Sequence, residues 1–127
     1  MSIVLAAALT SAPMVQLVCQ GGGNRRSLYD SQQYGETIRV EITETGGRIQ
    51  LPPAMLPPEL YGGDGGWYRL RSFTKTATTY SARVKVNFIN SPTVLIDRVV
   101  GTIRIDGGQS GFSGTCETVD GNAEAKF

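Results

Sequence analysis

The sequence predicts a small all-β domain, an antiparallel barrel of about eight strands. Apolar and polar residues alternate with a period of two in several short segments, which is the pattern of half-buried strands. Turn signals separate these segments, and 16 of the 127 residues are glycine. No segment keeps a helical period for more than two turns, so we expect no substantial helix.

The composition limits the domain count and the chemistry. At 127 residues the chain has room for one domain with a modest core. A formal net charge of +1 gives no long-range attraction to nucleic acid or to an anionic membrane. The chain contains no histidine, which removes the commonest general acid–base and the commonest metal ligand.

The first half of the domain is predicted to hold three strands and an irregular segment. Val15–Cys19 and Thr37–Glu44 are predicted strands, separated by a polar, glycine-rich loop from Gln20 to Gly35. A turn at Thr45-Gly46-Gly47 leads into a short partner strand, residues 48–51. Leu51–Gly66 contains two Pro-Pro pairs and is expected to run over the surface as extended or turn structure.

The second half is predicted to be strands joined by tight turns. In Trp67–Phe73 both faces carry apolar residues, so its facing is ambiguous. Ser81–Phe88 alternates most clearly and is followed by Asn90-Ser91-Pro92. The remaining predicted strands are Thr93–Val100, Thr102–Asp106 and Phe112–Thr118.

The two cysteines lie near opposite ends of the domain. A closed meander brings its first and last strands together, so we expect a disulfide between Cys19 and Cys116. The alternative is two buried free thiols in a cytosolic protein. Because a closed meander explains why the first and last strands each carry a cysteine, the preferred architecture is an up-and-down barrel with lipocalin-like connections. A β-sandwich is the second choice.

The ends of the chain read as segments outside the domain. An apolar run from Ile3 to Leu9, followed by small residues, predicts a signal peptide over residues 1–12. The run lacks a preceding Lys or Arg, so a native apolar strand or helix is the alternative. It is too short to span a bilayer, which takes about 20 residues. We expect a single β domain at 13–119, a polar tail at 120–127, and a periplasmic or secreted location.

Four segments resemble a group of small uncharacterised exported bacterial β-proteins. They are Cys19-Gln20-Gly21-Gly22-Gly23, Arg48-Ile49-Gln50-Leu51-Pro52, Ile96-Asp97-Arg98-Val99-Val100-Gly101-Thr102-Ile103 and Phe112-Ser113-Gly114-Thr115-Cys116. The resemblance spans most of residues 13–118 and implies a cell-envelope or secreted β fold. It supplies no catalytic residues.

No catalytic, metal or cofactor site is recognisable. Without histidine a Ser-His-Asp or Cys-His site cannot form, and Gly111–Gly114 lacks the spacing of a nucleophile elbow. The run Gly21–Arg26 lacks the Lys-Ser/Thr of a phosphate-binding loop. Asp64 and Asp106 sit beside glycines without the dense acidic array of a calcium site. We expect no cofactor and no metal.

Two surfaces are candidates for binding. The first is a glycine-rich loop with aromatic residues, Tyr61, Asp64, Trp67 and Tyr68, for which the alternative is that Trp67 and Tyr68 begin a strand and plug the barrel end. The second is a basic stripe on outward positions, for which a solvated sheet face is the alternative. Its members are Arg69, Arg71, Arg83, Lys85, Arg98 and Arg104.

The leading functional hypothesis is a non-enzymatic β scaffold of the bacterial cell envelope. Its partner is an unknown protein or envelope component, or a small apolar ligand if the barrel is hollow. We expect no nucleic-acid partner and no transmembrane segment. One alternative is a periplasmic inhibitor of a wall-degrading enzyme, by analogy of size and location. The other is a hydrolase with two converging carboxylates.

Overall fold

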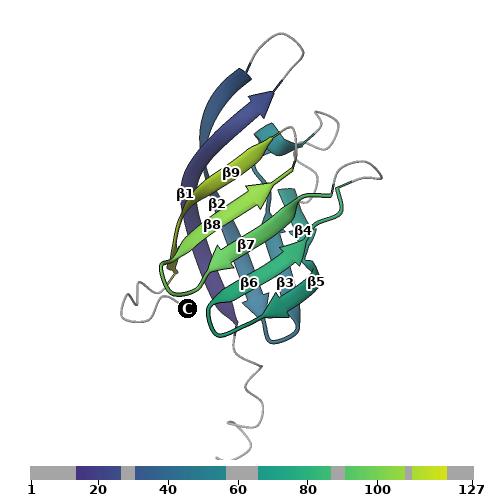
Figure 1. Cartoon of the computed structure of the whole chain (residues 1–127), viewed down its shortest axis with the longest axis vertical. Helices are drawn as coiled ribbons and strands as arrows, with labels where there is room; N and C mark the ends of the chain where they lie inside the picture. Colours follow the sequence, from purple (N-terminus) through teal and green to yellow (C-terminus); the bar gives the residue numbers. More distant parts are fainter. Residues whose placement is uncertain (1–13, 27–30, 57–65, 87–90, 108–109, 120–127) are drawn as a thin grey trace, which may run out of the picture.

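The computed structural model describes residues 14–26, 31–56, 66–86, 91–107 and 110–119 (Figure 1). These residues form one nine-stranded antiparallel sheet and a single turn of 3-10 helix, η1 (Pro53–Met55). The strands are β1 (Val15–Arg26), β2 (Ser31–Thr43), β3 (Gly46–Gln50), β4 (Trp67–Arg69), β5 (Arg71–Lys75), β6 (Thr79–Arg83), β7 (Thr93–Asp97), β8 (Thr102–Asp106) and β9 (Gly111–Thr118).

The sheet is a nearly closed up-and-down barrel, which confirms the predicted fold class. Its strand order is β4-β3-β2-β1-β9-β8-β7-β6-β5. The first strand, β1, pairs with the last, β9, and every other pair joins strands that are consecutive in the sequence. Figure 1 shows the sheet curling until β5 and β4 approach from opposite edges. The count is nine because the predicted strand at Trp67–Phe73 divides at Leu70.

The two edges of the sheet meet at a seam, which we define as the junction of β4 and β5. β4 pairs with β3, whereas β5 pairs with β6, so one short stretch of chain crosses from one edge to the other. The Leu70 N–H donates to the Gly47 carbonyl at 2.9 Å and anchors the crossing to β3. A second contact near the seam joins Lys75, at the end of β5, to Glu44 in the turn between β2 and β3. The Lys75 ammonium lies 3.1 Å from a Glu44 carboxylate oxygen.

Apolar side chains from alternate positions fill the interior. Because successive strand residues face opposite sides, each strand sends one set inward, where the sets form one continuous core. Its members are Leu17, Cys19, Ile38, Val40, Ile42, Ile49, Leu51, Met55, Leu56, Leu70, Tyr80, Ala82, Val84, Val94, Ile96, Ile103, Ile105, Phe112 and Cys116. The inward apolar positions of the predicted strands Thr37–Glu44 and Ser81–Phe88 therefore do not line an open lumen. Ile38, Val40, Ile42 and Val84 pack as core, Val86 is half-buried at its margin, and Phe88 lies outside the described residues.

The disulfide between Cys19 and Cys116 is present and links the first strand to the last. The two residues face each other directly in the β1–β9 ladder, with Cα atoms 4.0 Å apart and both side chains buried. The bond closes the barrel at the strand pair that joins the two ends of the domain.

The predicted loop from Gln20 to Gly35 is wrong. β1 continues to Arg26 and β2 begins at Ser31, so the glycines lie inside a long antiparallel pair. The reason is close approach of the backbones. A Cβ on Gly21 would overlap the Ser113 carbonyl oxygen of β9, and a Cβ on Gly114 would overlap that of Gln20. Glycine here permits pairing rather than a turn.

Several predicted boundaries also shift. The proline-rich stretch does not run only over the surface, because Leu51, Pro52, Met55 and Leu56 are buried. The strand predicted most clearly, Ser81–Phe88, corresponds to β6, which begins at Thr79 and ends at Arg83. The predicted strand Thr93–Val100 ends at Asp97, where a turn begins.

The ambiguous facing of Trp67–Phe73 is resolved by a bulge. Tyr68 and Leu70 turn inward, while Arg69 and Arg71 are exposed. The β5–β6 register then shifts between Arg71 and Thr74, and Phe73 packs inward against Tyr80, with ring centroids 5.8 Å apart. Ser72, within the bulge, has a φ of 53°, in the left-handed region.

The predicted signal peptide and polar tail lie outside the described residues. In the part of the chain that the structure describes, no helix has the length and apolar character needed to cross a membrane. The disulfide suggests an oxidising, extracytoplasmic environment.

Candidate anion-binding surface

Four arginines lie on the outer surface around the seam, and we call Arg48, Arg69, Arg71 and Arg83 the arginine band. Arg48 of β3 faces Arg69 of β4 directly across the ladder. Arg71 of β5 faces Arg83 of β6 in the same way. Since Arg69 and Arg71 flank the inward Leu70, the two pairs are neighbours along the chain.

The band juxtaposes like charges, and of its four members only Arg48 also faces a described acid, Glu41, across a ladder. Directly opposed side chains of one sign destabilise an antiparallel pair, whereas opposite signs stabilise it by about 0.2–1 kcal/mol. All four arginines are exposed. Among the described acidic residues, Glu41 alone forms an ion pair with the band, through Arg48 at 2.7 Å. The arrangement leaves Arg69, Arg71 and Arg83 open to a ligand of opposite charge.

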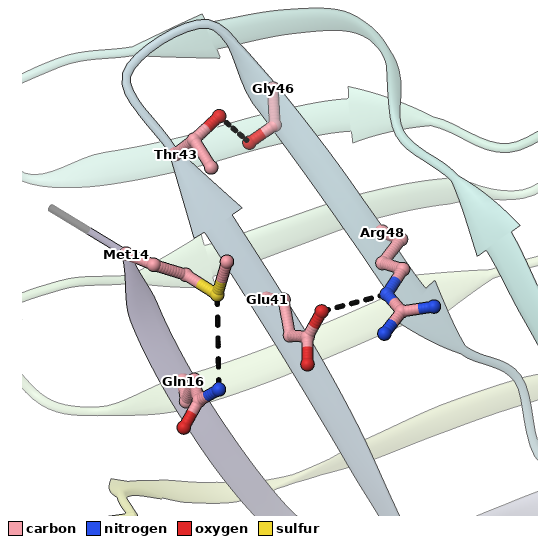
Figure 2. A network of polar contacts seen from close by, with 6 residues as sticks. All are labelled: Met14, Gln16, Glu41, Thr43, Gly46 and Arg48. Atoms are coloured by element: carbon pink, nitrogen blue, oxygen red, sulfur yellow. Dashed lines mark hydrogen bonds and ion pairs between the residues drawn. The ribbon is translucent and has the colours of Figure 1, made fainter. Parts of the chain in front are cut away.

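One end of the band opens into a hollow, which we call the Trp67 groove. It has a volume of about 620 Å³. The residues that line it come from β2, β3, β4 and the start of β1: Met14, Glu41, Thr43, Gly47, Arg48, Trp67, Arg69 and the inward-facing Tyr68. Figure 2 shows Met14, Gln16, Glu41 and Arg48 projecting side by side from the first three strands.

Arg48 is held in place within this groove. Its Nε donates to a Glu41 carboxylate oxygen at 2.7 Å. Its guanidinium carbon lies 4.2 Å from the centroid of the Trp67 ring, a cation–π distance. Two contacts from different strands thus fix the guanidinium plane before any ligand arrives.

The structure brings only part of the predicted basic stripe together. Arg69, Arg71 and Arg83 cluster, and Lys85 follows Arg83 on the exposed side of the chain. Arg98 lies at the opposite end of β7, over the Tyr80 ring at 4.6 Å, with a guanidinium N–H donating to the Thr76 carbonyl. Arg104 lies between Leu95 and Ser113 on the outer face of β8.

Sequence reasoning missed Arg48. The alternation in residues 48–51 marks it as outward, but nothing in the sequence gives its register against Arg69 across the proline-rich stretch. Of the predicted contact loop, Trp67 and Tyr68 begin β4 and are half-buried. Tyr61 and Asp64 lie outside the described residues.

A second hollow, of about 380 Å³, lies over the glycine-rich end of β1, β8 and β9. Arg104 and Asp106 both line it, so its described charges balance, whereas the Trp67 groove has two arginines and one acid. The neighbouring Gly21 and Gly22 are paired with β2 on one side and β9 on the other. The backbone groups of these two glycines therefore serve the ladders.

No carboxylate pair or metal cluster emerges from the described residues. Each of the two hollows contains a single described acid, Glu41 in one and Asp106 in the other. Within the same part of the chain, no three cysteine or acidic side chains come close enough to hold a metal ion.

Comparisons with protein-family models, with curated proteins and with solved structures found no match. No family is therefore identified. Of the resemblance to small exported bacterial β-proteins, the structure supports the coarse features, a small nearly closed β-barrel and a Cys19–Cys116 disulfide.

Proposed function

We propose that this chain is a non-enzymatic binding module of the bacterial cell envelope, periplasmic or secreted, that binds an anionic partner through the arginine band. The observation that carries the proposal is the presence of two pairs of directly opposed arginines, Arg48 with Arg69 and Arg71 with Arg83. Such pairs weaken a sheet, so their presence on an exposed face favours a role in binding.

The rest of the molecule supports a rigid scaffold for that face. The seam is anchored by the Leu70–Gly47 hydrogen bond, and the disulfide links the opposite side of the barrel. The interior is packed with apolar side chains, which favours a surface site over a ligand in the lumen.

The test is binding of purified full-length chain to three polyanions of matched charge: oligogalacturonate, polyglutamate and polyphosphate. At low salt we expect binding that weakens as ionic strength rises, because exposed charges are screened. The double variant Arg71→Gln/Arg83→Gln should bind at least about tenfold more weakly, since each lost contact costs on the order of 1 kcal/mol.

The matched control is Arg39→Gln/Arg104→Gln, which removes the same charge from exposed positions outside the band. It should bind like the unaltered chain. Absence of binding to all three polyanions, or equal losses in the two double variants, would overturn the proposal.

A further inference from the structure

The Trp67 groove has features that a purely electrostatic surface does not need. It places the half-buried Trp67 ring and Met14, which is 50% exposed, beside two cations and the single carboxylate of Glu41. Arg48 and Arg69 border the same hollow and face each other across the β3–β4 ladder. A ligand that fits must therefore offer an anionic group and an apolar surface close together.

Arg48 is oriented for a carboxylate. A guanidinium carries five N–H donors in a planar fork that matches the two oxygens of a carboxylate. Glu41 takes the Nε donor and the Trp67 ring fixes the plane, which leaves the terminal N–H groups for a ligand. Because these two contacts already restrict the side chain, binding costs less conformational entropy than it would for an unpaired arginine.

The apolar surface distinguishes between classes of polyanion. A polyphosphate carries no apolar surface. An acidic peptide carries its carboxylates on flexible side chains, which lose rotamer freedom when they are immobilised. In a uronic acid the carboxylate is fixed on a pyranose ring, whose C–H face is apolar and rigid. The groove fits this third class best.

We propose that the Trp67 groove is a subsite for a ring-borne carboxylate, so that the anionic partner is an acidic polysaccharide. One uronic acid unit occupies the groove with its carboxylate on Arg48 and Arg69, and further carboxylates follow the band towards Arg71 and Arg83. This inference rests on the proposed function and names its partner.

Trp67 provides a direct readout, because it is the sole tryptophan of the chain. We expect oligogalacturonate to change the intrinsic tryptophan fluorescence and to bind at least about tenfold more tightly than polyglutamate of equal charge. Trp67→Leu should remove most of this preference, because the ring both packs against the sugar and positions Arg48, and it should weaken polyglutamate binding much less. Leu95→Ala, which trims an exposed apolar side chain on β7 outside the groove, should leave both affinities unchanged.

The outcomes separate this inference from the proposed function. Equal affinity for oligogalacturonate and polyglutamate, with unchanged fluorescence, would overturn the polysaccharide assignment while the anion-binding role stands. Failure of all three polyanions to bind would remove both. The fluorescence of the unaltered chain decides the question even if Trp67→Leu does not fold.

Discussion

Individual glycines determine how closely β1 and β9 approach. Gly21 and Gly114 oppose each other two positions beyond the disulfide, and a Cβ on either would overlap a carbonyl of the facing strand. The glycines therefore allow the ladder to continue past Cys19 and Cys116 without displacing the backbone.

Gly21→Ala should destabilise the fold by about 1–3 kcal/mol, the usual range for overpacking. The matched control is Gly35→Ala, where the nearest atom to a Cβ would be the Gly21 carbonyl oxygen at 3.7 Å, an ordinary contact. It should change stability by less than about 0.5 kcal/mol. Urea unfolding of the two variants checks this, and equal midpoints would contradict the close-approach explanation.

Tyr34 gives the fold a pH dependence in the alkaline range. Burial, with a smaller contribution from nearby Glu36, raises the pKa of Tyr34 to about 12. Its hydroxyl donates to the Gly111 carbonyl at 2.7 Å, and its ring lies 6.4 Å from that of Phe112.

Below about pH 10 both folded and unfolded chains keep this proton, so Tyr34 adds no pH dependence there. Between about pH 10 and 12 the unfolded chain loses the proton and the folded chain keeps it, so stability falls as the pH rises. Tyr34→Phe should lack this part of the decline. Denaturation midpoints measured from pH 9 to 12 test it, and parallel curves for the two proteins would count against the assignment.

At the scale of elements, the β7–β8 turn is held rigid while it exposes two apolar side chains. The Asp97 carboxylate accepts hydrogen bonds from the N–H groups of Val99 and Val100, at 2.9 and 2.8 Å. Gly101, with a φ of 86°, completes the turn in the left-handed region. Val99 and Val100 are nevertheless 63% and 62% exposed.

Asp97→Ala should cost about 1 kcal/mol of stability, since two turn hydrogen bonds lose their acceptor. Amide hydrogen exchange at Val99 and Val100 should accelerate. Glu117→Ala, at an exposed position on β9, provides the control and should be close to neutral. Unchanged exchange in Asp97→Ala would show that other contacts hold the turn.

The sequence predicted most strands because their inward positions are apolar and their outward positions polar, as in β2 and β8. It could not predict the extension of β1 through Gly21–Gly23, since a glycine run reads as a loop unless the facing backbone is known. It could not reveal the bulge at Ser72 either, because Arg71 and Phe73 share a parity along the chain and still face opposite sides. Arg48 belongs to the site because β3 pairs with β4, although residues 57–65 separate the two strands in the sequence. No local pattern predicts that pairing.

At the scale of the whole molecule, the fold class and the disulfide were predictable together. An antiparallel meander that closes must join its first and last strands, and each of those strands carries a cysteine. The arginine band was predictable only in part, because it depends on which edges meet at the seam.

The disulfide should be a major contributor to stability, because it closes a loop of 97 residues. In the chain-entropy account such a loop contributes roughly 4–5 kcal/mol. Cys19→Ala/Cys116→Ala should therefore shift the urea midpoint strongly, and reduction of the unaltered chain should do the same. A loss below about 1 kcal/mol would mean that the packed barrel alone determines stability.

The most direct test of the account uses Arg83→Glu, because it separates the two consequences of the arginine band. Glutamate opposite Arg71 replaces a repulsive cross-strand pair with an attractive one, so stability should rise by about 0.2–1 kcal/mol. Binding to oligogalacturonate should fall at least about tenfold in the same protein. Arg104→Glu makes the same charge change beside Leu95 and Ser113 and should leave binding intact. Undiminished binding by a correctly folded Arg83→Glu would contradict the role of the band.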